Sequence, residues 1–387
     1  MKSKVLVIFK YPRPWNIDVI NRFSNYYDTE YLYISNYKNK NFTEIINETN
    51  NLIKSKNIEI IVFDVDYFKF VNTFFIDKIH GKKKILVTGD DTDQHNMNLI
   101  TASACDLVLS HCPLSVLKFK EKGHEAHMIN FEISNLKKNN NQKEIDVLFF
   151  GNLTPDRNEI LDYIENEDIS LKNVGHREHV MGLPQNELTK LISKSKIVLN
   201  LSKTRTTSVI NYGSESTHRF HYQFKGRIYL TGLIGTMCVS EYSPGQEIIF
   251  KEDELPTFFT KEECVKILKR LLKDDALLEK YTNKFTLKVY ELWEDKKNFE
   301  PIYNAIEKSN HRRVQLIKFP YWYLRIAAKQ IILRNIKLST LIKTIFQFNI
   351  IFSIIRNSNF IVKFLVIIES IVNTLWYSFI LTIKPKK

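Results

Sequence analysis

Residues that suit phosphate binding follow apolar runs in the second half of the chain. Gly151 ends the run at 145–150, and a glycine there lets backbone N–H groups approach a phosphate closely. Arginine offers phosphate a planar bidentate fork, whereas lysine offers a point charge. Donors and positive charge for such a site stand at Thr154, Arg157, Lys225 and Arg227, with Asn200 and Ser202 at the end of a neighbouring run. The alternative is that Arg157 and Arg227 are solvated residues on helix faces.

A cluster of acids with one histidine follows the third apolar run and is the candidate for proton transfer. Asp90 and Asp91 are adjacent, so repulsion between their charges raises the pKa of one carboxyl towards a useful range. Such a carboxylate, or His95 nearby, can take the proton of an attacking hydroxyl. Asp64 and Asp66, after the preceding run, are alternative bases. The alternative role for Asp90 or Asp91 is that of a helix N-cap.

Nothing in the sequence predicts a metal site or a cofactor. The four cysteines form no C-x-x-C pair, so we expect buried, reduced thiols in a reducing compartment. His218 and His221 lie three positions apart without an evident third metal ligand. The polar stretch at 202–223 that contains them is either a loop that folds over a ligand or a plain surface loop. We therefore expect neither metal nor cofactor.

The elements that position these residues are apolar runs alternating with helix-length segments. Continuous apolar runs are typical of strands buried on both faces of a parallel sheet. We expect strands at 4–9, 58–63, 84–88, 107–110 and 126–130, and again at 145–150, 196–201, 237–240 and 247–250. The predicted fold class is α/β, with two tandem Rossmann-like domains that form a cleft between them.

These patterns divide the chain into four parts. We predict a first Rossmann-like domain at 1–135, a polar linker at 136–145, a second domain at 146–309 and a basic, apolar helical tail at 310–387. The sequence has no G-x-G-x-x-G, Walker A or G-x-S-x-G motif, which counts against a dehydrogenase, a P-loop enzyme and an α/β-hydrolase. The N-terminal residues form a strand rather than a signal peptide, so we expect a cytoplasmic body.

The positive charge of the chain is concentrated in its tail. Residues 310–387 contain thirteen lysines and arginines but a single acid, Glu369, while the remainder is nearly neutral. A nucleic-acid-binding body would need the reverse distribution, so we expect no nucleic acid partner. Helices at 321–337 and 364–383 are predicted to lie on an anionic membrane surface. A true span at 364–383 and packing of the helices on the body are the alternatives.

Four blocks in the second domain resemble the CgeB/YkvP-type spore-maturation glycosyltransferases. They are DVLFFG at 146–151 followed by Arg157, LISKSKIVLNL at 191–201, FKGRIY at 224–229, and SEY at 240–242 followed by Gly245 and the run at 247–250. Their order matches that of the family. The resemblance implies a GT-B fold and transfer of a sugar from a nucleotide-activated donor. It also implies that cationic side chains and a helix N-terminus, rather than a metal, neutralise the leaving diphosphate.

One position departs from the family pattern. The resemblance implies a glutamate that holds the nucleotide ribose at 230, where this chain has Leu230. Glu241 and Glu247 on the next loop are candidates to replace it. We therefore expect a metal-independent glycosyltransferase on the inner face of the membrane, whose first domain binds a lipid-linked or polymeric glycan acceptor. A catalytically inactive scaffold or sugar-nucleotide-binding protein of the same fold is the alternative.

Overall fold

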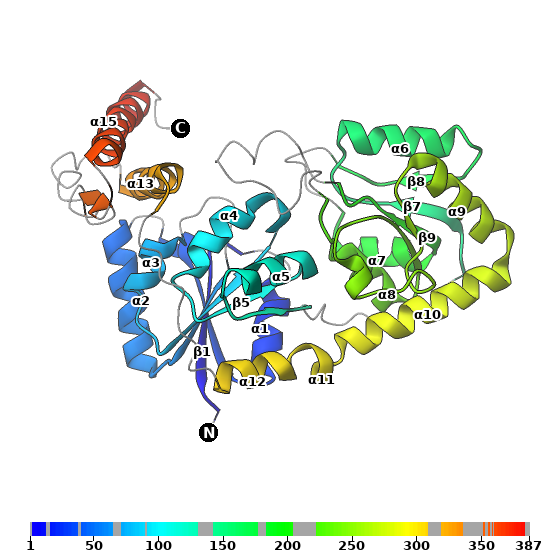
Figure 1. Cartoon of the computed structure of the whole chain (residues 1–387), viewed down its shortest axis with the longest axis horizontal. Helices are drawn as coiled ribbons and strands as arrows, with labels where there is room; N and C mark the ends of the chain where they lie inside the picture. The colour runs from blue at the N-terminus through cyan, green and yellow to red at the C-terminus, as the bar shows by residue number, and fades with distance from the viewer. Residues whose placement is uncertain are drawn as a thin grey trace.

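The structure, a computed structural model, contains two parallel sheets side by side, each covered by helices (Figure 1). This confirms the predicted α/β fold class. The described residues are 2–12, 16–37, 40–64, 71–89, 91–130, 142–176, 183–203, 222–308, 319–335, 351–352, 355–356, 358 and 360–383. Most of the predicted linker and of the polar stretch at 202–223 lies outside them.

The first sheet has six parallel strands in the order β2-β1-β3-β4-β5-β6. The strands are β1 (Lys4–Phe9), β2 (Asp28–Tyr33), β3 (Ile60–Asp64), β4 (Lys83–Thr88), β5 (Leu107–Ser110) and β6 (Ala126–Met128). The connecting helices are α1 (Asn16–Ser24), η1 (Ile34–Tyr37), α2 (Phe42–Lys56), α3 (Thr73–Lys78), α4 (Asp91–Ala102) and α5 (Pro113–Glu121). Sequence patterns missed β2, because this edge strand is polar and only partly buried.

The second sheet has five parallel strands in the order β11-β10-β9-β7-β8. They are β7 (Ile145–Phe149), β8 (Leu171–Asn173), β9 (Ser195–Asn200), β10 (Met237–Glu241) and β11 (Thr257–Phe258). Its helices are α6 (Pro155–Glu165), α7 (Gln185–Ser193), α8 (Arg227–Ile234), η3 (Gln246–Ile248), α9 (Lys261–Lys273) and α10 (Asp275–Trp293). The strand predicted at 247–250 is wrong, and β8 and β11 were missed.

The physical reason for the wrong strand lies in a local turn. Gly245 has a left-handed φ of 94°, and the Gln246 side chain accepts a hydrogen bond from the backbone N–H of Ser243. These features begin a short 3-10 helix instead of a ladder. Ile249 and Phe250 are nevertheless buried in the core of the second domain. These residues are apolar because they pack into the core. A short apolar run of this kind cannot be told from a buried strand by its sequence pattern alone.

Both faces of each sheet are covered, as the continuous apolar runs predicted. In β1, Leu6 and Ile8 pack into one core cluster, while Val5, Val7 and Phe9 pack into another on the opposite face. Successive side chains of a strand point to opposite faces, so a run that is apolar throughout requires two cores. The helices on both sides of the first sheet provide them.

The chain returns to the first domain after α10. Helices α11 (Asp295–Asn298) and α12 (Glu300–Lys308) follow, and Phe299, Ile302 and Ile306 join the core cluster that contains alternate residues of β1. Asn130 and Asn298 fix this crossing reciprocally. The N–H of Asn130 donates to Oδ1 of Asn298 at 2.9 Å, and Nδ2 of Asn298 donates to the Asn130 carbonyl at 2.5 Å. In packing terms, residues 299–308 thus belong to the first domain.

The tail begins with a helix that docks on the first domain and continues to a second helix beside it (Figure 1). These are α13 (Tyr321–Asn335) and α15 (Phe360–Ile383). Leu324 and Ala328 of α13 and Val366 of α15 join the first domain's core. Packing of the tail on the body, one of the alternatives, is therefore observed for these faces. Within the described ranges, no helix is both long and apolar enough to cross a bilayer.

Tyr323 joins the tail to the first domain by hydrogen bonds, and its hydroxyl is fully buried. It accepts a hydrogen bond from the N–H of Thr73 at 3.0 Å and shares one with the Thr73 hydroxyl at 2.7 Å. We expect Tyr323→Phe to lower the free energy of unfolding by about 1–3 kcal/mol, because it leaves the buried Thr73 N–H unsatisfied. Denaturant titration measures the change, with Tyr31→Phe on exposed β2 as the control. Equal stability of the two variants would contradict a docked tail.

Candidate functional site

The strand order of the second sheet defines a topological switch point between β7 and β9, at the carboxyl edge of the sheet. The chain runs from β7 outward to β8, then crosses back to β9 on the other side of β7. Ligands of open α/β sheets bind at such a switch point, because the connections leave in opposite directions and open a crevice. Gly151 follows β7, and Asn200 is the last residue of β9. The sequence thus places two of its candidate residues on either side of this crevice.

Arg227 lies directly against Gly151. The glycine has a φ of 125°, and a Cβ built there would be 2.2 Å from Nη2 of Arg227. The position therefore requires glycine for two reasons: its backbone conformation and the close approach of the guanidinium. Arg227 is also the first residue of α8, so its charge stands at the N-terminus of a helix, where backbone N–H groups point outward.

Aromatic rings surround the guanidinium of Arg227, and no acid among the described residues contacts it. Its guanidinium carbon lies 4.9 Å from the ring centre of Phe150 and 5.3 Å from that of Phe149. Nη1 donates a long hydrogen bond of 3.3 Å to Oδ1 of Asn200, and Nε is buried without a partner. Burial, followed by the like charge of Arg157, lowers the pKa of Arg227 to about 9. The guanidinium therefore remains protonated at neutral pH. A bound anion would stabilise this buried positive charge.

Arg157 has a different role, which is to hold the walls of the crevice together. It is 6% exposed, and its two Nη atoms donate to the carbonyls of Asn152, Leu201 and Lys203 at 2.6–3.2 Å. These carbonyls lie after β7 and after β9. Thr154 caps α6 by accepting the N–H of Arg157 at 3.4 Å. Both residues position the loops around Gly151, and Arg157 adds positive charge next to Arg227.

Glu241 ties the ends of β9 and β10 together. Its Oε2 accepts the backbone N–H groups of Ser202 and Lys203 at 2.7 and 2.9 Å, and the Ser202 hydroxyl at 3.3 Å. Burial raises the pKa of this carboxyl, while the hydrogen bonds oppose the rise. Asn200 extends the same buried edge by donating from Nδ2 to the Ser240 hydroxyl at 2.8 Å. Glu241 and Ser202 therefore shape the edge on which Asn200 meets Arg227.

The remaining donor-side candidates are more peripheral. Lys225 is partly buried, and its Nζ contacts the side-chain oxygen of Gln223. Glu247 is exposed and accepts the N–H of Gly245 at 3.0 Å, in the turn that begins η3. The structure thus brings Gly151, Asn200 and Arg227 into contact, with Arg157 as their support, and leaves Glu247 in a separate turn.

Of the candidates for proton transfer, Asp91 has its carboxylate in a buried network. Oδ1 accepts Nδ2 of Asn98 at 2.7 Å, and Oδ2 accepts the hydroxyls of Thr88 and Ser110. This arrangement joins the ends of β4 and β5 to the first turn of α4. Asp90 lies outside the described residues. The switch point of the first sheet falls between β1 and β3, where the alternative base Asp64 ends β3.

His95 is buried in α4 against the ring of Phe119, with 4.8 Å between ring centres. Burial, followed by the charge of Lys118, lowers its pKa from 6.5 to about 4. His95 therefore binds a proton more readily in the unfolded chain than in the folded chain. Stability is complete above the unfolded pKa and decreases as the pH falls from 6.5 to about 4, by about 3 kcal/mol in total. We expect His95→Phe to remove most of this loss.

Urea unfolding at neutral pH and at about pH 4.5 measures this effect. The free energy of unfolding should differ less between the two conditions in His95→Phe than in the unmodified chain. His80→Phe is the matched control, because His80 is exposed and its replacement should leave the pH dependence unchanged. An identical acid loss in all three proteins would contradict the assignment.

The carboxyl edges of the two sheets approach each other. A Cβ built on Gly245, in the turn after β10, would be 3.0 Å from the backbone nitrogen of Leu114 and 3.1 Å from Cγ of Pro113. Pro113 and Leu114 begin α5, which follows β5. The crevice beside Gly151 and the carboxyl edge of the first sheet therefore belong to the same side of the molecule.

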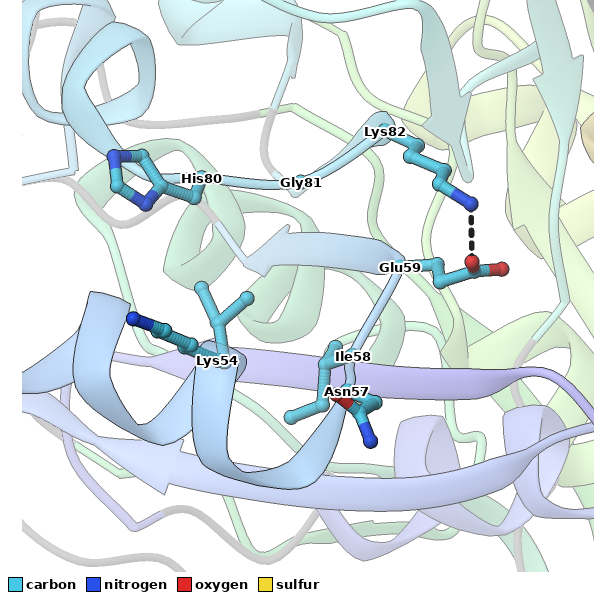
Figure 2. Close-up of a pocket in the computed structure, with 8 residues that line it drawn as sticks. Lys54, Asn57, Ile58, Glu59, His80, Gly81 and Lys82 are labelled. Atoms are coloured by element: carbon cyan, nitrogen blue, oxygen red, sulfur yellow. Dashed lines mark hydrogen bonds and ion pairs between the residues drawn. The ribbon is translucent and has the colours of Figure 1, made fainter.

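A separate hollow lies at the opposite edge of the first sheet. Figure 2 shows it between the end of α2 and the segment before β4, lined among others by Lys54, His80 and Gly81. Lys82 and Glu59 pair with each other across it. Since the amino ends of β3 and β4 are here, the hollow is remote from the crevice at Gly151.

Sequence reasoning found the cations but not their supports. Phe149 and Phe150 were assigned to a strand only, although they form the wall on which Arg227 lies. An aromatic pair immediately before a glycine at a strand end was the available signal. Leu230, where the family resemblance implied glutamate, packs in a core cluster with Leu148 and Val198.

Comparisons with known proteins concern the fold and the second domain. Residues 133–291 match the family model described as Glycosyl transferase-like. No curated protein matches the chain. Anabaena HepE in complex with UDP and glucose has 12% identity and a TM-score of 0.55, with 79% of this chain and 100% of that chain covered. Sucrose-phosphate synthase from Thermosynechococcus elongatus has 8% identity and a TM-score of 0.54, with 79% and 98% covered.

A third similar structure is an α-glucosyltransferase in complex with UDP and a 13-mer DNA that contains an HMU base. It has 12% identity and a TM-score of 0.51, with 80% of this chain and 100% of that chain covered. At these identities the similarity concerns the fold. The chain has the GT-B fold of glycosyltransferases, and the match to the glycosyl transferase-like family model falls on residues 133–291.

Proposed function

We propose that the protein is a glycosyltransferase that uses a nucleotide-sugar donor, with uridine diphosphate as the first candidate nucleotide. The observation that carries the proposal is Arg227, a partly buried cation at a helix N-terminus that lies against Gly151 at the switch point, with no contacting acid in the part of the chain that the structure describes. Two similar structures of the same fold contain UDP. The four sequence blocks further favour the CgeB-type group within this fold.

Arg227 would act on the leaving group. When an acceptor hydroxyl attacks the anomeric carbon, the bond from that carbon to the diphosphate oxygen breaks and the electron pair leaves with the diphosphate. We infer that the guanidinium, together with the positive end of the α8 dipole, stabilises this charge. Lys225 adds a cation two residues earlier. With these groups, we propose that transfer is metal-independent.

The proton of the acceptor hydroxyl requires a base on the first domain. Asp90 remains our candidate, and its neighbour Asp91 is held in a buried hydrogen-bond network. Asp64, at the switch point, is the alternative. Because these residues follow strands whose carboxyl edge faces the donor crevice, we propose that the acceptor glycan binds there. We further propose a membrane-linked or polymeric acceptor at the inner face of the membrane.

A calorimetric and thermal-shift screen of the full chain against UDP, GDP, CMP, dTDP and their sugars tests the proposal. A nucleotide that binds only the folded state, at one hundred times its Kd, should raise the free energy of unfolding by about 2.7 kcal/mol. We expect this for one nucleotide, followed by slow hydrolysis of the corresponding nucleotide sugar. Folded protein that binds none of them at millimolar concentration would overturn the proposal.

One observation favours a second candidate, a sugar-nucleotide-binding protein without transferase activity. Leu230 lies in the core, and the nearby acid Glu241 already accepts hydrogen bonds from Ser202 and Lys203. Leu230 therefore does not supply the ribose contact that the family resemblance implied, and Oε2 of Glu241 is already engaged. Tight nucleotide binding without hydrolysis of any sugar nucleotide would support this candidate over the first.

A further inference from the structure

Helix α15 exposes an apolar face instead of a polar one. A helix at the surface of a water-soluble domain normally turns its polar side outward. In α15 the inner positions are Val366 and Ser370, both nearly fully buried. The large apolar side chains exposed along the described first half of the helix are Phe360, Ile361, Phe364, Leu365, Ile368, Ile371 and Val372. We call these seven side chains the α15 ridge.

The ridge is continuous and strongly exposed. Phe360 is 80% exposed and Ile361 67% exposed, and the rings of Phe360 and Phe364 stack with centres 6.3 Å apart. Its members recur every three or four residues, so they lie on one side of the helix. Phe352, in the segment before α15, is exposed as well. A contiguous apolar surface of this kind marks a site of interaction rather than scattered surface residues.

Basic side chains accompany the ridge, and the one acid of the tail is neutralised. Arg325 and Lys329 are exposed on α13, and Arg356 is exposed just before α15. Glu369 does not oppose them, because Nε of Arg325 contacts its Oε1 at 2.6 Å and the Tyr321 hydroxyl donates to its Oε2 at 3.1 Å. Among the described residues of the tail, the charge that remains is positive. Apolar side chains beside uncompensated bases suit a bilayer surface with anionic headgroups.

The position of the ridge defines an orientation. Helices α13 and α15 lie on the first domain, at the end of the molecule away from the second sheet (Figure 1). Tyr323 fixes α13 through Thr73, and Leu324 and Val366 fix the pair in the first domain's core. A surface that binds the ridge therefore holds the first domain next to it. The second domain, with Arg227, stays on the aqueous side.

We propose that the α15 ridge and the neighbouring bases of α13 form a docking surface for an anionic lipid bilayer. The apolar side chains enter the boundary between headgroups and acyl chains, and the bases contact the headgroups. The inference deepens the proposed function and rests on it only for the acceptor, since a docked first domain meets membrane-linked glycans directly. Lipid binding itself is independent of the nucleotide site.

Flotation of the full chain with vesicles tests the proposal. We expect binding to vesicles of phosphatidylcholine with phosphatidylglycerol, and weaker binding to phosphatidylcholine alone. Ile361→Glu/Phe364→Glu/Ile368→Glu should reduce binding roughly a hundredfold, because three apolar anchors become acids. The matched control is Leu287→Glu/Phe259→Glu, two exposed apolar residues of the second domain. Lys329→Gln/Arg356→Gln should remove the preference for the anionic lipid, as high salt should.

The alternative occupant is a second copy of the chain. If the full chain binds neither vesicle type, or if the triple variant floats as well as the unmodified chain, the proposal is overturned. The ridge would instead be assigned to self-association by a different result. In that case the unmodified chain would not bind vesicles and would be a dimer in light scattering, whereas the triple variant would be a monomer. Because the three side chains are exposed, the variant should keep its unfolding temperature. Its nucleotide-induced thermal shift separates a failure of lipid docking from a failure of the proposed function.

Discussion

Arg227→Met is expected to weaken nucleotide binding about a hundredfold without destabilising the free protein. The variant removes a guanidinium that would donate two charge-assisted hydrogen bonds to a diphosphate. Affinity should decrease by about 3 kcal/mol, roughly two orders of magnitude. Methionine keeps an apolar stem against Phe149 and Phe150. The free protein loses a 3.3 Å hydrogen bond to Asn200 and the contacts of the guanidinium with these two rings, but it no longer buries a positive charge next to Arg157. Its free energy of unfolding should therefore be equal or higher.

This opposite response of binding and stability distinguishes a ligand site from a structural arginine. Isothermal titration measures the affinity, and denaturant unfolding without nucleotide measures the stability. Arg270→Met is the matched control, because Arg270 is exposed on α9 and its guanidinium also lies over an aromatic ring, that of Tyr281. It should change neither quantity. Unchanged affinity in Arg227→Met, or a large loss of stability, would refute the role we assign to Arg227.

Gly151→Ala is expected to weaken nucleotide binding about as strongly as Arg227→Met. An alanine at a φ of 125° is strained by about 1–3 kcal/mol. Its Cβ would also be 2.2 Å from Nη2 of Arg227, so the guanidinium must leave its position. The two effects predict lower stability together with a loss of affinity. In the double variant Gly151→Ala/Arg227→Met, the affinity losses should not add, because both changes remove the same group.

Gly81→Ala is the control that separates the effect of backbone strain from the effect of displacing Arg227. Gly81 has a φ of 154°, and a Cβ there would be 2.6 Å from Cγ1 of Ile61, a buried residue of β3. It lies in the hollow at the opposite edge of the first sheet (Figure 2). This variant should therefore lose stability as Gly151→Ala does, yet bind nucleotide with unchanged affinity. Equal affinity losses in both glycine variants would show that the effect is global.

The candidate site was only partly readable from the sequence. Arg227 and Gly151 belong to segments far apart in the chain, and their contact depends on parallel pairing of β7 with β9 and on the position of α8. Arg157 could be read as a phosphate ligand from its charge. The structure instead shows that its N–H groups donate to three backbone carbonyls. These carbonyls need a hydrogen-bond donor only because folding brings the loops after β7 and β9 together. Likewise, the engagement of Glu241 by Ser202 and Lys203 is a product of folding.

What the sequence determined by itself is whatever depends on local pattern. Continuous apolar runs such as 4–9 and 145–150 required strands covered on both faces, and this was enough for the fold class. The tertiary structure decided which apolar residues are hidden and which remain outside. The residues of α15 are almost uniformly apolar, so periodicity could not tell the face of Val366 from that of Ile361. Only docking of α13 and α15 on the first domain separates them, because burial depends on neighbours distant in the chain.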